Sequence, residues 1–228
     1  MRYDITSIKA GLTLITERSI RYVPLLAKLD SHCGDGDMGV SIYMGATAVK
    51  NEVITYQGND VGELFVRSGM SLNRSAPSTI GTLLSSCLLM LGKKFKGCHV
   101  ILESEIIQIP TYCADAIMLR GNAQIGDKTI LDALIPLSEA IIETYNECGD
   151  MEEALRRGAH AAKLGAHNTR GMLAKIGRAK WIADRSKEYP DAGAVYCSIV
   201  MDGFVDRNKP EGYILPDYEA MYAKREKK

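Results

Sequence analysis

The residues best suited to chemistry in this sequence are three aspartates close together in a glycine-containing segment. Asp30, Asp35 and Asp37 fall within eight positions, and glycine stands on either side of Asp35. Carboxylates this close repel one another and resist joint ionisation unless a cation lies between them. Glycine lets the chain curl through conformations closed to other residues, so these side chains can converge. The segment predicts a cation site; a solvated turn with a capping aspartate is the alternative.

The type of ligand decides which cation fits. Carboxylate oxygens are hard ligands that suit Mg²⁺ or Ca²⁺ and not zinc. The segment lacks the D-x-D-x-D-G spacing and the downstream glutamate of a calcium EF-hand. A Mg²⁺ ion held by few carboxylates keeps coordination positions for phosphate oxygens, and a helix predicted over residues 41–50 would offer backbone N–H groups to such a phosphate. His32 and Cys33 lie inside the segment without zinc partners, and we expect His32 to be structural or exposed.

Helical periodicity dominates the rest of the chain. Near the N-terminus apolar residues recur at the spacing of one helix face: Ile5, Ile8, Leu12 and Ile15. Residues 128–145 repeat this pattern, and Asp150 is placed to cap a further helix that runs to about residue 167. Residues 194–201 are apolar and short, so a helix and a buried strand are both compatible, and the context favours a helix. Because no series of strands joined by hairpin turns is present, the prediction is an all-α fold.

Turn-forming residues gather in four places that separate the helical stretches: residues 31–39, 73–82, 121–127 and 189–193. We find no linker, low-complexity segment or internal repeat. The economical prediction is one helical domain whose loops carry the chemistry.

Composition narrows the class of protein. The 228 residues are 46% hydrophobic and 25% charged, with 28 basic and 28 acidic residues and a net charge of zero. Neither a nucleic-acid partner nor a membrane surface is indicated, and the basic residues 224–228 are expected to form a solvated tail. Six cysteines without C-x-x-C spacing favour thiols in a reducing cytoplasm. The N-terminus lacks the apolar run of a signal peptide, and the longest apolar run, around residues 83–91, is too short to span a bilayer, so a cytoplasmic location is expected.

With these features in place, the chain resembles the DhaL (Dak2) family, the nucleotide-binding subunit of dihydroxyacetone kinases. Four segments carry the resemblance in the family's order: Leu29-Asp30 with Gly34-Asp35-Gly36-Asp37-x-Gly39; Arg120-Gly121-x-Ala123-x-x-Gly126-Asp127-Lys128-Thr129; Gly177-Arg178-Ala179 with Arg185-Ser186; and Asp191-Ala192-Gly193-Ala194. A chance match to four motifs in the family's order is far rarer than a chance match to a single glycine loop. The resemblance covers residues 1–205, and residues 206–228 are predicted to be a C-terminal extension of unknown role.

The resemblance implies a barrel or bundle of about eight antiparallel helices with a nucleotide, ADP or ATP, at one end. It implies two Mg²⁺ ions held by Asp30, Asp35 and Asp37, with no catalytic residue in this chain beyond these ligands. The implied nucleotide contacts are Met38, Gly39, Val40, Ser41, Ser75, Ala76, Gly121, Ile130, Arg178, Asp191, Ala192 and Gly193. Arg178 would pair with a phosphate or stack on the base; without the resemblance, a surface salt bridge is favoured for it.

The resemblance also implies a division of labour between chains. A separate DhaK-like subunit carries the ketose on its own histidine, so this chain would be one half of a ketose kinase. The phosphoryl group would come from ATP directly, or from bound ADP rephosphorylated by a DhaM-like phosphocarrier of the phosphotransferase system. A homodimer is a further candidate assembly.

Two departures from the family pattern favour a divergent branch. Met38 stands where the family has a histidine, and a methionine cannot donate a hydrogen bond to phosphate. Residues 73–82 lack most of the family's glycines, although Arg74, Ser75 and Ser78 add a charge and hydroxyls that can compensate. The alternatives are therefore a kinase subunit with a different sugar partner and a nucleotide-sensing regulatory protein without turnover. A helical metal-binding protein without nucleotide would leave the other motifs as coincidence.

Overall fold

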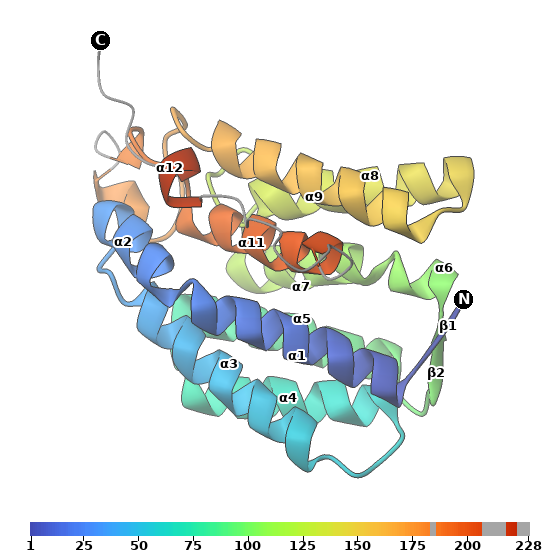
Figure 1. Cartoon of the computed structure of the whole chain (residues 1–228). Coiled ribbons are helices and arrows are strands. Elements are labelled where there is room, and N and C mark those ends of the chain that lie inside the picture. The colour runs from blue at the N-terminus through green and yellow to red at the C-terminus, as the bar shows by residue number, and fades with distance from the viewer. Residues whose placement is uncertain (183–185, 207–217, 223–228) are drawn as a thin grey trace. The chain divides into compact units, whose positions relative to one another are not determined.

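The computed structural model describes residues 1–182, 186–206 and 218–222 (Figure 1). Helices dominate these ranges beside a two-stranded sheet, which confirms the all-α prediction. The chain divides into two compact units, Met1–Arg21 with Val40–Asn122, and Tyr22–Gly39 with Ala123–Lys228. The predicted tail at residues 224–228 and most of the predicted extension lie outside the described residues.

The first unit contains the small sheet and most of the N-terminal helices. Its elements are β1 (Arg2–Asp4), α1 (Ile5–Arg21), α3 (Met38–Thr55, from Val40 onward), α4 (Val61–Ser75), α5 (Thr79–Lys94), β2 (Val100–Leu102), α6 (Glu103–Ile106) and α7 (Ile109–Gly121). β1 and β2 are antiparallel, with Tyr3 opposite Ile101. α5 packs on α4 and α7.

Apolar burial and side-chain caps explain these helices. The predicted face of α1 buries Ile8 and Leu12 in a core that also contains Leu64 and Phe65 of α4. Asp60 caps α4 by accepting a hydrogen bond from the Glu63 backbone N–H (3.1 Å), which satisfies one of the amides that a helix start leaves unpaired.

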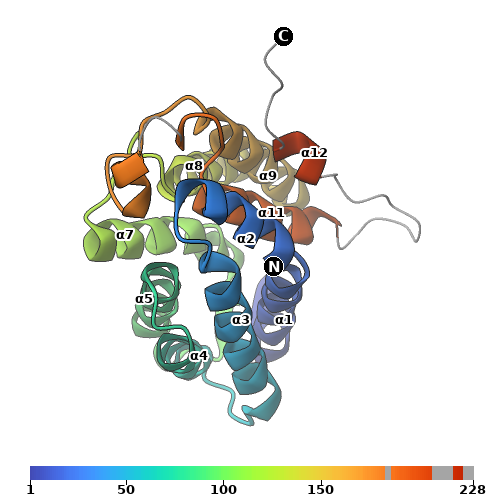
Figure 2. The ribbon, with the colours of Figure 1, turned by 90° about the vertical axis from the view of Figure 1, so that its left-hand side faces the viewer.

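The second unit carries the acidic segment and the C-terminal helices. Its elements are α2 (Val23–Cys33), α8 (Leu131–Cys148), α9 (Met151–Asn168), η1 (Arg178–Ile182), α11 (Ala192–Asp206) and α12 (Tyr218–Tyr222). α8, α9 and α11 lie side by side (Figure 1, Figure 2). α8 and α9 approach closely at Gly165, where a β-carbon would lie only 2.2 Å from the Asp132 carbonyl oxygen. Any larger residue there would separate the two helices.

The short helix α12 is bound to this unit by two buried tyrosines. The Tyr218 hydroxyl donates to the buried carboxylate of Asp202, which also pairs with Lys163 at 2.7 Å. The backbone carbonyl of Tyr222 accepts a hydrogen bond from the Arg170 guanidinium at 3.1 Å. A buried carboxylate requires such partners because desolvation penalises an unpaired charge.

Several predicted boundaries differ from the structure. The helix expected from residue 128 begins at Leu131, and the one expected over 41–50 runs from Met38 to Thr55. The loop expected over 73–82 is much shorter, because α4 continues to Ser75 and α5 begins at Thr79. α4 ends at Ser75, and Ala76 leaves helical geometry because the residue before a proline, here Pro77, disfavours it. The predictions for the helices around residues 151–167 and 194–201 are confirmed by α9 and α11.

Across the described ranges, no helix combines the length and apolar character needed to cross a membrane. The six cysteines all lie within these ranges, and no disulfide joins any two of them.

Candidate metal centre

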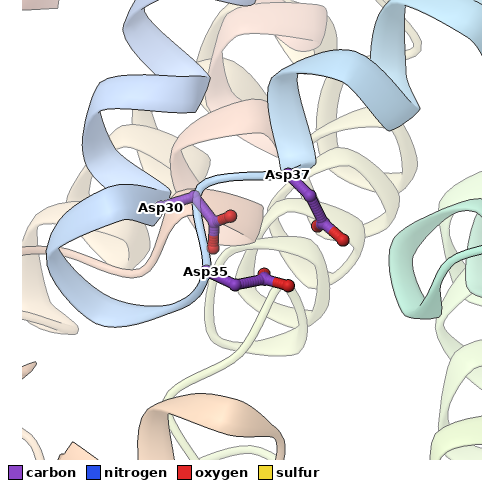
Figure 3. Close-up of side chains that lie close together, drawn as sticks. All are labelled: Asp30, Asp35 and Asp37. Atoms are coloured by element: carbon purple, nitrogen blue, oxygen red, sulfur yellow. The ribbon is translucent and has the colours of Figure 1, made fainter.

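The structure brings the side chains of Asp30, Asp35 and Asp37 to one point (Figure 3). Asp30 lies in the last turn of α2, Asp35 in the loop that follows, and Asp37 directly before α3. One carboxylate oxygen from each lies within 4.8 Å of the others. Three converging hard oxygen donors fit a divalent cation such as Mg²⁺, which would offset their mutual repulsion. Their role as ligands stays a prediction.

Two glycines make this convergence sterically possible. A β-carbon on Gly34 would lie 2.4 Å from an Asp30 carboxylate oxygen, so no other residue fits there without moving that carboxylate. Gly36 has a φ of +79°, a left-handed backbone conformation that residues other than glycine rarely adopt. The glycine pattern of the sequence therefore corresponds to real constraints on this loop.

A backbone hydrogen bond orients Asp30. Its Oδ2 accepts a hydrogen bond from the Met38 backbone N–H at 3.1 Å, at the first residue of α3. The same carboxylate thus satisfies a helix-start amide and faces the other aspartates. Partners of this kind fix the direction of a metal ligand.

The segment that leads into α8 is organised by two further carboxylates. Asp132 accepts hydrogen bonds from the backbone N–H groups of Gly126 (2.6 Å) and Thr129 (2.7 Å). Asp127 accepts one from the Gln124 N–H at 3.0 Å. These bonds hold the G-D-K-T motif in a fixed turn, which explains why the helix begins three residues later than the periodicity predicts.

Asp191 links the end of α9 to the start of α11. Its backbone N–H donates to the Thr169 hydroxyl, and its carboxylate accepts from the Ala194 N–H, both at 2.8 Å. Burial raises the pKa of this carboxyl to about 6, although the Ala194 N–H opposes the shift. A β-carbon on Gly193 would lie 3.2 Å from that of Ile130. The structure therefore brings the predicted nucleotide residues Ile130, Asp191 and Gly193 together.

His32 has a structural partner. Its ring stacks on that of Tyr189, with ring centres 3.9 Å apart and planes 7° from parallel. This confirms the expectation that His32 is structural, and it connects the last turn of α2 to the segment before α11.

The other predicted nucleotide contacts are divided between the two units. In the second unit, Met38 and Gly39 begin α3, Arg178 begins η1, and Ala192 begins α11; Met38 is only 6% exposed. In the first unit, Val40 and Ser41 continue α3, Ser75 ends α4, Ala76 follows it, and Gly121 ends α7. The Ala76 N–H donates to the Leu72 carbonyl at 2.9 Å, so it is already bonded within the chain. All these contacts stay predictions; Arg185, part of the third motif, lies outside the described residues.

The sequence alone did not indicate three residues that join the end of α9, the segment before α11 and the last turn of α2. They are Lys128, Thr169 and Tyr189, whose partners lie far away in the sequence. Lys128 appeared only as part of a motif, and no local signal indicates that its ammonium is buried.

Comparison with known proteins identifies the family. The family model of the DAK2 domain matches residues 32–206. The ADP-binding subunit DhaL of the PEP-dependent dihydroxyacetone kinase of Escherichia coli is 27% identical over 176 residues, which are 77% of this chain and 84% of that subunit. The L-erythrulose kinase of Pectobacterium atrosepticum is 29% identical over 198 residues, which are 86% of this chain but 33% of that kinase. The chain thus spans about a third of that longer relative.

The fold also has a solved counterpart. The crystal structure of the dihydroxyacetone kinase from C. freundii in complex with AMP-PNP and Mg²⁺ matches with a TM-score of 0.69 and 22% sequence identity. The match covers 89% of this chain and 34% of that chain. At this identity the match supports the fold alone.

Fold and loop together define an all-helical protein with a three-carboxylate loop at the start of a helix. Since the family model matches well over half of the sequence, the chain belongs to the family of the DAK2 domain. The predicted resemblance to this family is thereby confirmed.

Proposed function

We propose that this chain is the Mg-nucleotide-binding subunit of a two-component ketose kinase. The observation that carries the proposal is the cluster of Asp30, Asp35 and Asp37 directly before the start of α3. Bound Mg²⁺ would neutralise phosphate charge and leave the terminal phosphoryl group in line for transfer. The chain's own contribution is to hold the cation, to offer the N–H groups of the first turn of α3, and to fix Asp30 through Met38.

The relatives support a partner that holds the ketose. The chain matches most of the length of an ADP-binding subunit, but only a third of an L-erythrulose kinase. The region therefore serves as a separate subunit in one relative and as part of a longer chain in another. We propose that a DhaK-like subunit presents the ketose here, and that the acceptor is a short ketose such as dihydroxyacetone or erythrulose.

Calorimetry with Mg²⁺ and ADP tests the nucleotide site. Asp35→Asn should weaken Mg-ADP binding about a hundredfold or more, because even residues that only orient a metal ligand change metal affinity about tenfold to a hundredfold. The control is Glu143→Gln, an exposed carboxylate on α8 that lies outside the cluster and should leave the affinity unchanged. Wild-type affinity in Asp35→Asn would exclude this loop as the binding site. Because the same titration in the absence of nucleotide counts the ions, it also tests the expectation of two.

The source of the phosphoryl group needs its own measurement. If ATP is used directly, the wild-type protein with a ketose-binding subunit should consume ATP in proportion to ketose phosphate. If bound ADP is rephosphorylated by a phosphocarrier, ADP should stay with the protein through purification and exchange slowly. Rapid exchange combined with ATP turnover would exclude the phosphocarrier route.

A nucleotide-sensing protein without turnover is the second candidate. The observation that favours it is Met38, whose side chain is apolar and 6% exposed at the first residue of α3. A buried thioether donates no hydrogen bond to a transferring phosphoryl group. Tight Mg-ADP binding without ketose phosphorylation in the presence of a ketose-binding subunit would favour this candidate over the kinase.

A further inference from the structure

Lys128 carries an ammonium group buried in the second unit. The residue is 2% exposed, and its Nζ donates to three backbone carbonyl oxygens: Thr169 (2.9 Å), Ser186 (2.7 Å) and Tyr189 (2.8 Å). An ammonium has three donors, so this set uses its full capacity. Burial lowers the pKa of Lys128, because desolvation penalises its charged form. The three hydrogen bonds to carbonyl oxygens offset part of this penalty.

Two of the three acceptors, Ser186 and Tyr189, lie on the segment that leads to the predicted nucleotide residue Asp191, and the third, Thr169, contacts Asp191 directly. Thr169 follows α9, and its hydroxyl accepts the Asp191 N–H at 2.8 Å. Ser186 and Tyr189 precede Asp191 by a few positions along the same segment. Lys128 thus ties residues 186–191 to the end of α9 from a position two residues before Ile130, which itself packs beside Gly193.

Two of these carbonyls belong to residues that contact the last turn of α2, the turn that carries Asp30. Tyr189 stacks on His32, two positions after Asp30 in α2. The Cys33 thiol lies 3.9 Å from the Ser186 carbonyl oxygen, which also accepts from Lys128. Residues 186–189 and the last turn of α2 are therefore joined through residues whose carbonyls bind Lys128.

The backbone is shaped to direct Lys128 to this place. Its φ of +62° is left-handed, which is uncommon for a residue other than glycine. The turn is maintained on both sides of Lys128 by the Asp132 carboxylate, which binds the N–H groups of Gly126 and Thr129. Such a conformation persists only where the surrounding structure holds it in place, and conformations of this kind are concentrated at functional sites.

We infer that Lys128 is the positioning residue that fixes residues 186–193 against the last turn of α2, so that the nucleotide site is formed before the ligand arrives. The inference rests on the proposed function, because it assigns a device to the same site. The proposed role of Lys128 involves no contact with the ligand. Lys128 keeps most molecules in the arrangement that can bind nucleotide, and apparent affinity falls when fewer molecules have that arrangement.

Lys128→Met, which keeps length and apolar volume but removes the ammonium, tests this inference. If about a tenth of the molecules then keep the competent arrangement, the Kd for Mg-ADP rises about tenfold. Binding of Mn²⁺ alone, followed by electron paramagnetic resonance, should change far less, because the three aspartates are intact. Lys128→Gln keeps two N–H donors and should recover part of the loss.

Lys163→Met is the matched control. It also removes a lysine that binds a buried acceptor in the second unit, since Lys163 pairs with Asp202 at 2.7 Å. It should lower thermal stability but leave the Kd for Mg-ADP within about twofold, at a temperature where circular dichroism shows every variant folded. An equal loss of Mg-ADP affinity in Lys128→Met and Lys163→Met would overturn the positioning role.

A measurement on the wild-type protein covers the case in which Lys128 variants do not fold. Amide hydrogens of residues 186–193 should exchange slowly before any nucleotide is added, and Mg-ADP should slow them little further. Fast exchange that becomes slow only with Mg-ADP would overturn the inference while the proposed function stands. If the wild-type protein binds no Mg-ADP at all, the proposed function itself fails, so the two failures are distinguishable.

Discussion

At the scale of single residues, Asp30 connects the metal cluster to the helix that follows it. Its carboxylate lies within 4.8 Å of those of Asp35 and Asp37, and its Oδ2 accepts a hydrogen bond from the Met38 N–H. The absence of a side chain on Gly34 leaves the space that this carboxylate occupies. A substitution of Asp30 therefore changes both the carboxylate cluster and the start of α3.

Asp191 is the residue for which pH dependence follows directly. Its pKa of about 6 in the folded state lies above the ordinary 3.8, because the carboxyl is buried. Between these values the folded state binds more protons than the unfolded state, so the contribution of Asp191 to stability is lost as pH rises from about 4 to 6. The loss is on the order of 3 kcal/mol at neutral pH.

Asp191→Asn should remove this dependence, because the amide oxygen still accepts the Ala194 N–H and carries no charge. Urea unfolding of both proteins at a series of pH values measures the difference. We expect the wild-type protein to lose stability relative to Asp191→Asn between about pH 4 and pH 6, and to stay lower above it. Parallel curves through this window would mean that the carboxyl is not destabilised by burial.

At the scale of elements, caps decide where several helices begin. Asp150 accepts hydrogen bonds from the backbone N–H groups of Glu152 (2.9 Å) and Glu153 (3.2 Å) at the start of α9. Gly149, with a φ of +67°, ends α8 just before it. α9 matters for the site because its end presents Thr169 to both Lys128 and Asp191.

Asp150→Ala should destabilise the protein by about 1 kcal/mol, the usual cost of losing an N-cap side chain. For a protein of this size that corresponds to a melting temperature lower by roughly 2–4 °C. Asp150→Asn keeps the acceptor oxygen and should stay close to the wild type. Calorimetric melting of the three proteins is the measurement, and equal melting of Asp150→Ala and Asp150→Asn would show that the cap hydrogen bonds contribute little.

At the scale of the whole molecule, the metal cluster and its supports are concentrated in one compact unit. Asp30, Asp35, Asp37 and the Lys128 hydrogen bonds all belong to the second unit. The proposed function assigns the Mg-nucleotide to this chain and leaves the ketose to another subunit, and the chain matches about a third of an L-erythrulose kinase.

We therefore expect the purified chain to bind Mg-nucleotide without phosphorylating a ketose by itself. Mg-ADP at about a hundred times its Kd should stabilise the fold by about 2.7 kcal/mol, because a ligand that binds only the folded state shifts the equilibrium. An assay with ATP, Mg²⁺, dihydroxyacetone and C4 ketoses should show no turnover until a ketose-binding subunit is added. Robust turnover by the isolated chain would contradict the two-subunit proposal.

The sequence by itself determined the features that depend on nearby residues. The apolar spacing along α1 and α8 follows from the 3.6-residue helical turn, and Asp150 caps α9 only two to three residues from the amides it binds. The acidic loop was recognisable because its ligands and glycines lie within a few positions, and four such local motifs were enough to identify the family.

Only the tertiary structure decided how the distant motifs are joined. The partners of Lys128 lie 41 to 61 positions away, and the Tyr189 ring that packs on His32 comes from another segment altogether. Periodicity carries no information about which distant carbonyls an ammonium meets. Burial of Lys128 and Asp191 likewise depends on how α8, α9 and α11 pack, because desolvation is a property of the assembled unit and not of any short stretch of chain.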